Sequence, residues 1–277
     1  MGAQNLANLI NPLEQAGYLE VSGSHLYTVL HGVANPVARI LLVGPFATER
    51  SASYIPWVRW ARFLADRQIE VLRYDYRGMG ESTGVFEDMS FDQWTEDVEF
   101  LAGWLKNRSP SVPLILHGLE MGALLAGKVF SAGVANALLL WAPPASANEV
   151  LRATLLRQIA VENMFKHGQE RKSAADYIRR LATEPLQVDG FPWSSKLWLE
   201  SFQLEMASSE DTEDSAASTY GRPLRAVKLD KTAAPLVKGS AYEAMNPDLH
   251  ELFNDNFAWI AKALAALRAK NFPQDAA

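Results

Sequence analysis

The stretch HGLEMGA, residues 117–123, decides how this chain folds. It follows the apolar run PLIL, which predicts a buried strand, and precedes ALLAGKVFSAG, which predicts a helix. A strand that turns sharply into a helix between glycines placed like Gly118 and Gly122 matches the Gly-x-Ser-x-Gly elbow, whose central residue is exposed on the turn. The central residue here is Glu120, so the hydroxyl of that pattern is missing.

Strands and helices alternate along the first half of the chain, on both sides of this elbow. Alternation of this kind predicts a parallel sheet with helices on both faces, and such sheets bind ligands at the carboxyl ends of their strands. Ser90 is a plausible N-cap for the second of the predicted helices. The predicted strands are 25–31, 39–44, 69–76, 113–118 and 136–143, and the predicted helices lie near 53–67, 91–107 and 120–132.

The pattern changes after Pro144, where helical periodicity continues without a convincing strand. A strand returns at 222–230, so we expect three parts. Residues 1–144 and 221–277 would form the two halves of one core, and 145–220 a helical cap inserted between them. The acidic stretch SSEDTEDSAAS within that insertion predicts a solvated loop.

Composition narrows the function classes. The chain has 277 residues, 48% of them hydrophobic, which is ample for a packed core. A net charge of −6 without a long basic run gives no support for a nucleic-acid partner. The absence of cysteine excludes disulfides and thiol chemistry, and we expect neither a metal site nor a cofactor. No leader-like start or long apolar segment appears, which predicts a cytoplasmic protein without an integral membrane segment; a homo-oligomer is compatible with the sequence.

A second Gly-x-Ser-x-Gly match competes with the elbow. RYDYRGMGESTG, residues 73–84, places Ser82 between Gly80 and Gly84. An exposed nucleophile on a strained turn needs a strand directly before it and a helix directly after it. Ser82 comes several residues beyond the strand and is followed by VFEDM, so we interpret this segment as a loop that packs near the site.

Four segments together resemble the α/β-hydrolase superfamily over nearly the whole chain: DYRGMGES, SFDQWTEDVEFLAGWL, HGLEMGALLAG and HELFND. Within it, LLVGPFATERSAS, LLLWAPPASANEVL and EPLQVDGFPWSS resemble the serine aminopeptidase- and lysophospholipase-like proteins encoded with exosortase and exopolysaccharide systems. The superfamily resemblance implies an α/β-hydrolase fold with a mostly parallel, eight-stranded sheet flanked by helices. It also implies a helical cap between the sixth and seventh strands and a Ser, Asp or Glu, His triad in that chain order.

The resemblance assigns a role to five positions of this chain. Glu120 stands at the nucleophile position, His250 matches the triad histidine, and Asp230 is the best match for the triad acid. The backbone N–H groups of Met121 and Phe46 match the oxyanion hole. His250 could equally be an ordinary residue of a helix opening, and Asp230 a capping or surface aspartate.

Three interpretations of Glu120 remain open. The active site could be lost, with the carboxylate accepting hydrogen bonds from the former oxyanion-hole N–H groups. Glu120 could be a nucleophile, as Asp is in superfamily members that act on epoxides or carbon–halogen bonds, although its extra methylene moves the attacking oxygen by about 1.5 Å. It could also be a general base or an anion that binds a ligand.

Two function classes follow from these interpretations. One is an enzyme that hydrolyses an ester, amide, epoxide or similar bond of a hydrophobic or acylated small molecule. The other is a non-catalytic ligand-binding or accessory protein of exopolysaccharide biosynthesis, with a degenerate triad. Whether the protein is an enzyme therefore stays open at this point.

The remaining histidines and tryptophans give weaker signals. His117 is expected to pack beside the end of its strand rather than act in catalysis, and no histidine spacing suggests a metal site. Tryptophans at helical spacing belong to the core more often than to a pocket. The other positions weighed are His25, His31, His167, Trp57, Trp60, Trp193 and Trp198.

Overall fold

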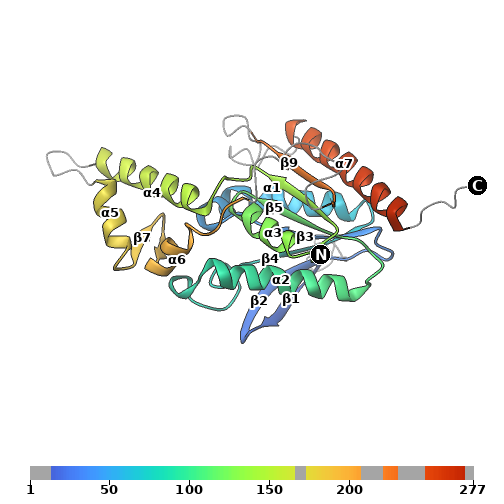
Figure 1. The fold of residues 1–277 in the computed structure, drawn as a ribbon, viewed down its shortest axis with the longest axis horizontal. Helices are drawn as coiled ribbons and strands as arrows, with labels where there is room; N and C mark the ends of the chain where they lie inside the picture. The colour runs from blue at the N-terminus through green and yellow to red at the C-terminus, as the bar shows by residue number, and fades with distance from the viewer. Residues whose placement is uncertain (1–13, 166–172, 207–220, 230–246, 272–277) are drawn as a thin grey trace, which may run out of the picture.

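A seven-stranded sheet forms the centre of the protein (Figure 1). The computed structural model describes residues 14–165, 173–206, 221–229 and 247–271. In the order β1-β2-β4-β3-β5-β6-β9, the first two neighbouring pairs are antiparallel and the other four are parallel. The strands are β1 (Glu14–Val21), β2 (Ser24–His31), β3 (Ala38–Val43), β4 (Ile69–Tyr74), β5 (Leu114–Leu119), β6 (Ala137–Trp141) and β9 (Leu224–Val227).

The sheet confirms the α/β-hydrolase fold that the sequence predicts, with one strand added. All residues of β3, β5 and β6 are buried, as expected for strands that helices cover on both faces. The added strand, β1, is exposed or half-buried at every residue except Val21, and in the described part of the chain it pairs only with β2, through the turn at Ser22 and Gly23. The number of eight strands stays a prediction, since residues 230–246 lie outside the described residues.

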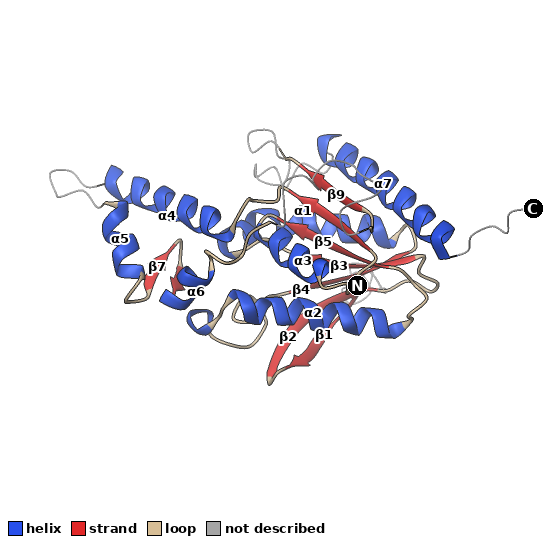
Figure 2. Ribbon diagram, in the orientation of Figure 1, coloured by secondary structure: helices blue, strands red, loops and turns tan. Residues whose placement is uncertain are grey.

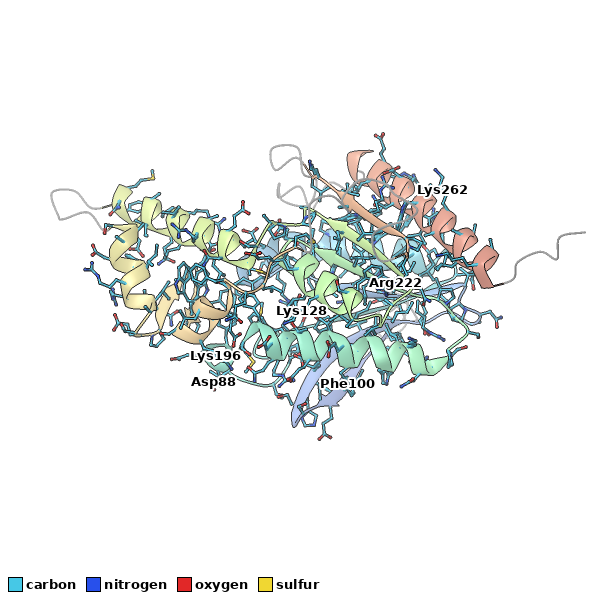
Figure 3. All side chains as sticks on the ribbon, viewed as in Figure 1. Asp88, Phe100, Lys128, Lys196, Arg222 and Lys262 are labelled. Atoms are coloured by element: carbon cyan, nitrogen blue, oxygen red, sulfur yellow. The ribbon has the colours of Figure 1, made fainter. Side chains whose placement is uncertain are left out.

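Helices cover both faces of the sheet (Figure 2). One face carries α1 (Ala47–Ala65) and α7 (Pro247–Asn271), and the other carries α2 (Phe91–Arg108) and α3 (Met121–Ser131). The predicted N-cap of α2 is confirmed, because the Ser90 hydroxyl accepts a hydrogen bond from the Gln93 N–H at 3.2 Å. Side chains fill the space between helices and sheet (Figure 3). Among the described residues, no helix is long and apolar enough to cross a membrane.

The segment between β6 and β9 extends away from the sheet (Figure 1). It contains α4 (Ala147–Met164), α5 (Ala174–Leu181), the strands β7 (Leu186–Val188) and β8 (Phe191–Trp193), and α6 (Ser195–Glu200). The expectation that this segment has no strand was wrong. Asp189 and Gly190 have φ angles of 54° and 85°, which close a two-residue hairpin turn of the type that favours Asp-Gly. The boundaries 145–220 stay a prediction, since 207–220 lie outside the described residues.

Two glycines let α3 pack with its backbone against the sheet. A Cβ atom on Gly122 would lie 2.2 Å from the carbonyl oxygen of Gly44, in the loop after β3. A Cβ atom on Gly118 would lie 2.4 Å from Cα of Ala123. Because both contacts are with backbone atoms, which cannot rotate away, any larger residue at either position must displace a main chain.

We predict opposite effects of two Gly→Ala substitutions within α3. Gly122→Ala should lower the free energy of unfolding by about 3 kcal/mol, because the new methyl group overlaps the Gly44 carbonyl. Gly127→Ala should raise it by about 0.5–1 kcal/mol, since its nearest neighbour, the Met206 sulfur, is 3.8 Å away and Ala favours the helix. Urea denaturation measures both changes. Equal effects of the two substitutions would show that close backbone packing does not limit Gly122.

Candidate functional site

Glu120 occupies a strained turn between β5 and α3. Its φ and ψ angles are 50° and −120°, a region that non-glycine residues adopt rarely and at a cost of about 1–3 kcal/mol. Two backbone hydrogen bonds hold the turn: the Glu120 N–H donates to the Trp141 carbonyl at 2.9 Å, and the Ala123 N–H donates to the Glu120 carbonyl at 2.8 Å. The carboxylate makes no capping hydrogen bond to α3. The elbow geometry is therefore present with Glu in its central position.

A pocket lies at this elbow, with an empty volume of about 320 Å³ that includes open solvent. Glu120 and Met121 line it beside Phe46, so three of the five predicted site residues meet there. Phe46 is the residue just before α1, at the end of the loop after β3, and Gly44 of this loop packs against Gly122 near the start of α3. The segment between β6 and β9 supplies the opposite wall, with Val150, Thr154, Arg157, Val188, Asp189 and Trp193.

Arg157 connects both walls of this elbow pocket. Its Nη1 atom lies 3.3 Å from Oε1 of Glu49 in α1, and its Nη2 atom lies 3.0 Å from Oδ2 of Asp189 in the β7–β8 turn. Burial lowers the pKa of Arg157, but the bond to Asp189 and the attraction of Glu49 outweigh burial and raise it. With Glu120, the described lining residues include three carboxylates and one guanidinium. This balance favours neutral or cationic ligands over anions.

His250 lies on the first turn of α7, where its side chain is exposed. The Asn254 amide nitrogen is 2.8 Å from its Nδ1 atom, and the ring of Phe63 is 6.4 Å away between centroids. Neither neighbour lines the elbow pocket. The helix begins at Pro247, a residue suited to the first helical position, so His250 is part of the helix rather than of a preceding loop. Its place beside Glu120 stays a prediction.

Asp230 lies outside the described residues, as do His167 and the acidic stretch 208–218. The triad acid therefore stays a prediction. Within the described ranges, no group of three or more His, Asp or Glu side chains is placed to hold a metal ion.

Ser82 is committed to structural hydrogen bonds. Its hydroxyl donates to the Asp75 carbonyl at 2.6 Å and accepts from the Tyr27 N–H at 2.8 Å. These bonds fasten the loop after β4 to β2. The segment is followed by a single turn of 3-10 helix, Phe86–Asp88, instead of an α-helix, which agrees with the interpretation of this segment as a packed loop.

His117 is buried among aromatic rings beneath the elbow. Its Nδ1 atom accepts a hydrogen bond from Trp60 Nε1 at 2.9 Å, and the ring of Trp141 is 4.5 Å away between centroids. Burial holds the pKa of His117 well below its ordinary value, so the ring is neutral. The prediction that His117 packs beside the strand is confirmed. Trp60 and Trp198 belong to the core, whereas Trp193 lines the elbow pocket.

His31 is the second buried histidine with an altered pKa. Its Nε2 atom accepts a hydrogen bond from Arg73 Nε at 3.0 Å. Burial, reinforced by the charge of Arg73, lowers the pKa of His31 from 6.5 to about 4, although Glu14 opposes this shift. His31 is therefore neutral at pH 7. Its hydrogen bond with Arg73 does not neutralise the positive charge of that arginine.

The fold and the family comparison identify the same class of protein. A mostly parallel sheet, helices on both faces and a strained elbow between β5 and α3 define the α/β-hydrolase fold. Residues 35–189, more than half of the chain, match the family profile described as serine aminopeptidase, S33. The chain belongs to this family. At the elbow, Glu120 stands where the Gly-x-Ser-x-Gly pattern has its serine.

Solved structures show the same fold. Est1E from Butyrivibrio proteoclasticus, with bound ferulic acid, is 16% identical and has a TM-score of 0.64, with 90% of this chain and 100% of that chain covered. The α/β hydrolase GrgF from Penicillium is also 16% identical, with a TM-score of 0.60 and coverage of 91% and 99%. No curated protein matches the sequence.

We predict that the protein loses stability between pH 6.5 and pH 4 partly through His31. Across this window the unfolded chain binds a proton at His31 and the folded chain does not, so stability falls as the pH falls. The contribution is at most about 3 kcal/mol. In His31→Gln, whose amide oxygen can still accept from Arg73, denaturation across this range should show a smaller pH dependence. An unchanged pH dependence would show that His31 does not titrate in this way.

Proposed function

We propose that this protein binds a small apolar or acylated molecule in the elbow pocket and has no serine-hydrolase activity. The observation that carries the proposal is the position of Glu120. This residue occupies the strained turn where a serine hydrolase has its nucleophilic serine, and it carries a carboxylate instead of a hydroxyl. A serine alkoxide forms an acyl-enzyme that water resolves, whereas a carboxylate that attacked an ester would give a mixed anhydride. The nearby alternative, Ser82, has its hydroxyl engaged on both sides.

The walls of the elbow pocket support the proposed class of ligand. Phe46, Met121 and Trp193 are buried apolar residues, and Val150 and Val188 add aliphatic surface. The charged residues carry more acid than base, which disfavours a free carboxylate or phosphate. A neutral acyl ester or amide, or an amine with an apolar body, fits both properties.

In this proposal the segment between β6 and β9 acts as a cap over the ligand. Arg157 holds it to the core through Glu49 and to its own hairpin through Asp189. The three-part division 1–144, 145–220 and 221–277 belongs to the same proposal, as does a cytoplasmic location. A role beside exopolysaccharide synthesis is a narrower proposal, supported by the resemblance of three segments.

The alternative is an enzyme in which Glu120 itself reacts. A carboxylate at the elbow could attack an epoxide carbon and form an ester that water then hydrolyses, or could serve as a general base for water. The observation in its favour is that Glu120 is held in the strained elbow and lines the pocket. His250 and Asp230 would then assist the hydrolysis of the intermediate.

We predict that the natural protein hydrolyses short- and medium-chain p-nitrophenyl esters no faster than Glu120→Ala. A fluorophosphonate probe should also leave the natural protein unlabelled, because it reacts with activated serine. Both proteins should have the same melting profile by circular dichroism, which controls for folding. Ester or epoxide hydrolysis that Glu120→Ala abolishes would establish the alternative, and labelling at Ser82 would contradict our assignment of the elbow.

Glu120→Ser extends this test to the predicted triad. Activity that appears in this variant would show that His250, Asp230 and the N–H groups of Met121 and Phe46 are assembled and that the natural protein lacks the nucleophile. Continued inactivity would show that the triad is incomplete beyond Glu120. The two results separate a scaffold inactivated at one residue from a site dedicated to binding.

We predict that the elbow pocket binds decanamide, a neutral acyl amide, more tightly than decanoate. Thr154→Trp should weaken decanamide binding about tenfold or more, because the indole fills the space between α4 and the elbow. Leu156→Trp is the matched control, since Leu156 lies on the same helix, is 51% exposed and does not line the pocket. Isothermal titration calorimetry measures the affinities. Equal loss in both variants would contradict binding in this pocket.

A further inference from the structure

A second pocket opens at the carboxyl end of β4, against the first turns of α1. Its empty volume is about 410 Å³, which includes open solvent. It shares no lining residue with the elbow pocket, because Gly44 and Pro45 line this one and the next residues, Phe46 and Ala47, line the other. We call it the β4 pocket. Its remaining walls come from Arg50, Ser53, Tyr54, Trp57, Val58, Arg73, Tyr74, Asp75 and Tyr76.

The charge balance of the β4 pocket is positive. Arg50 forms an ion pair with Asp75, so these two charges offset each other. Arg73 uses Nε to donate to His31, and that ring is neutral because its pKa is about 4. No carboxylate among the described residues forms an ion pair with Arg73. Glu14 is bound by Arg62 at 2.6 Å, and the charge of Arg73 also lowers the pKa of Glu14, so Glu14 offsets part of the Arg73 charge. Because Arg62 and Arg73 share this one carboxylate, one positive charge remains beside the pocket.

Aromatic groups surround this charge. Tyr54 is 46% exposed, and the guanidinium carbons of Arg50 and Arg73 each lie 5.8 Å from the centroid of its ring. Tyr74 follows Arg73 in β4, so its side chain packs in the cluster on the opposite face of the sheet and does not reach this charge. The Tyr76 hydroxyl donates to the Gly44 carbonyl at 2.7 Å. Trp57 completes the apolar wall.

We propose that the β4 pocket is a second ligand site, which binds an organic carboxylate with a planar apolar body. The two Nη groups of Arg73, which have no hydrogen-bond partner among the described residues, face a group able to accept two parallel hydrogen bonds, as a carboxylate does. Tyr54 and Trp57 cover the ligand body. Two arginines against one aspartate leave one net positive charge, which a monoanion balances and a phosphate dianion would exceed.

Benzoate is the probe that tests this site, and benzamide is its neutral isostere. Ligand-observed NMR titration of the full chain should show benzoate binding at least about tenfold more tightly than benzamide, and Arg73→Gln should lose that preference. Arg73→Lys should retain part of it, because the charge remains. Arg152→Gln is the control, since Arg152 is an exposed arginine of α4 away from the pocket.

Two further variants keep the proposal falsifiable. Tyr54→Ala should weaken benzoate binding even if Arg73→Gln fails to fold, because Tyr54 is exposed and its removal leaves the core intact. Thr154→Trp, which fills the elbow pocket, should bind benzoate as the natural protein does. Equal affinity for benzoate and benzamide, tighter binding of inorganic phosphate than of benzoate, or loss of benzoate binding in Thr154→Trp would each overturn the proposal. None of these outcomes depends on whether the elbow pocket binds acyl ligands.

Discussion

Backbone contact between α3 and the loop after β3 is the constraint on which the rest of the structure depends. Gly122 packs so closely on the carbonyl of Gly44 that no side chain fits between them. That contact holds the start of α3 beside Phe46 and leaves Glu120 in a conformation that only surrounding structure can maintain. The elbow pocket exists because two main chains meet there, independently of the residue at the centre of the turn.

The sequence predicts the fold well where a local signal is strong. Continuous aliphatic runs identify β3, β5 and β6, since buried parallel strands need apolar residues on both faces. The hairpin of β7 and β8 was missed because strands of three residues show no periodicity, and its one usable signal was the Asp189–Gly190 pair. The strand β1 was missed for a different reason: it lies at the edge of the sheet, most of its residues are exposed or half-buried, and EQAGYLEV contains no continuous apolar run.

At the site, too, the residues with a local sequence signal were predicted and those without one were not. Glu120 and Met121 follow from one local motif, and Phe46 follows from its position after a strand, so the sequence brings all three to the pocket. The placement of His250 depends on where α7 begins, and Arg157 reaches the pocket from a distant helix without any motif. Side chains that meet through tertiary packing are visible in the structure alone. Membership of a hydrolase family likewise describes a scaffold, while chemistry depends on the groups at the elbow.

The loop after β3 and the first residue of α1, residues 44–47, separate the two pockets. Gly44 and Pro45 line the β4 pocket, and Phe46 and Ala47 line the elbow pocket. Two contacts hold the loop at the Gly44 carbonyl oxygen: the Tyr76 hydroxyl donates to this oxygen, and Gly122 packs closely against it. Exposed surface loops usually accept insertions, which makes them the regions where related proteins differ most in length. This loop has no such freedom, because one added residue would have to project into one of the two pockets. Engineered diversity is better directed to the segment between β6 and β9, where new length can extend into solvent.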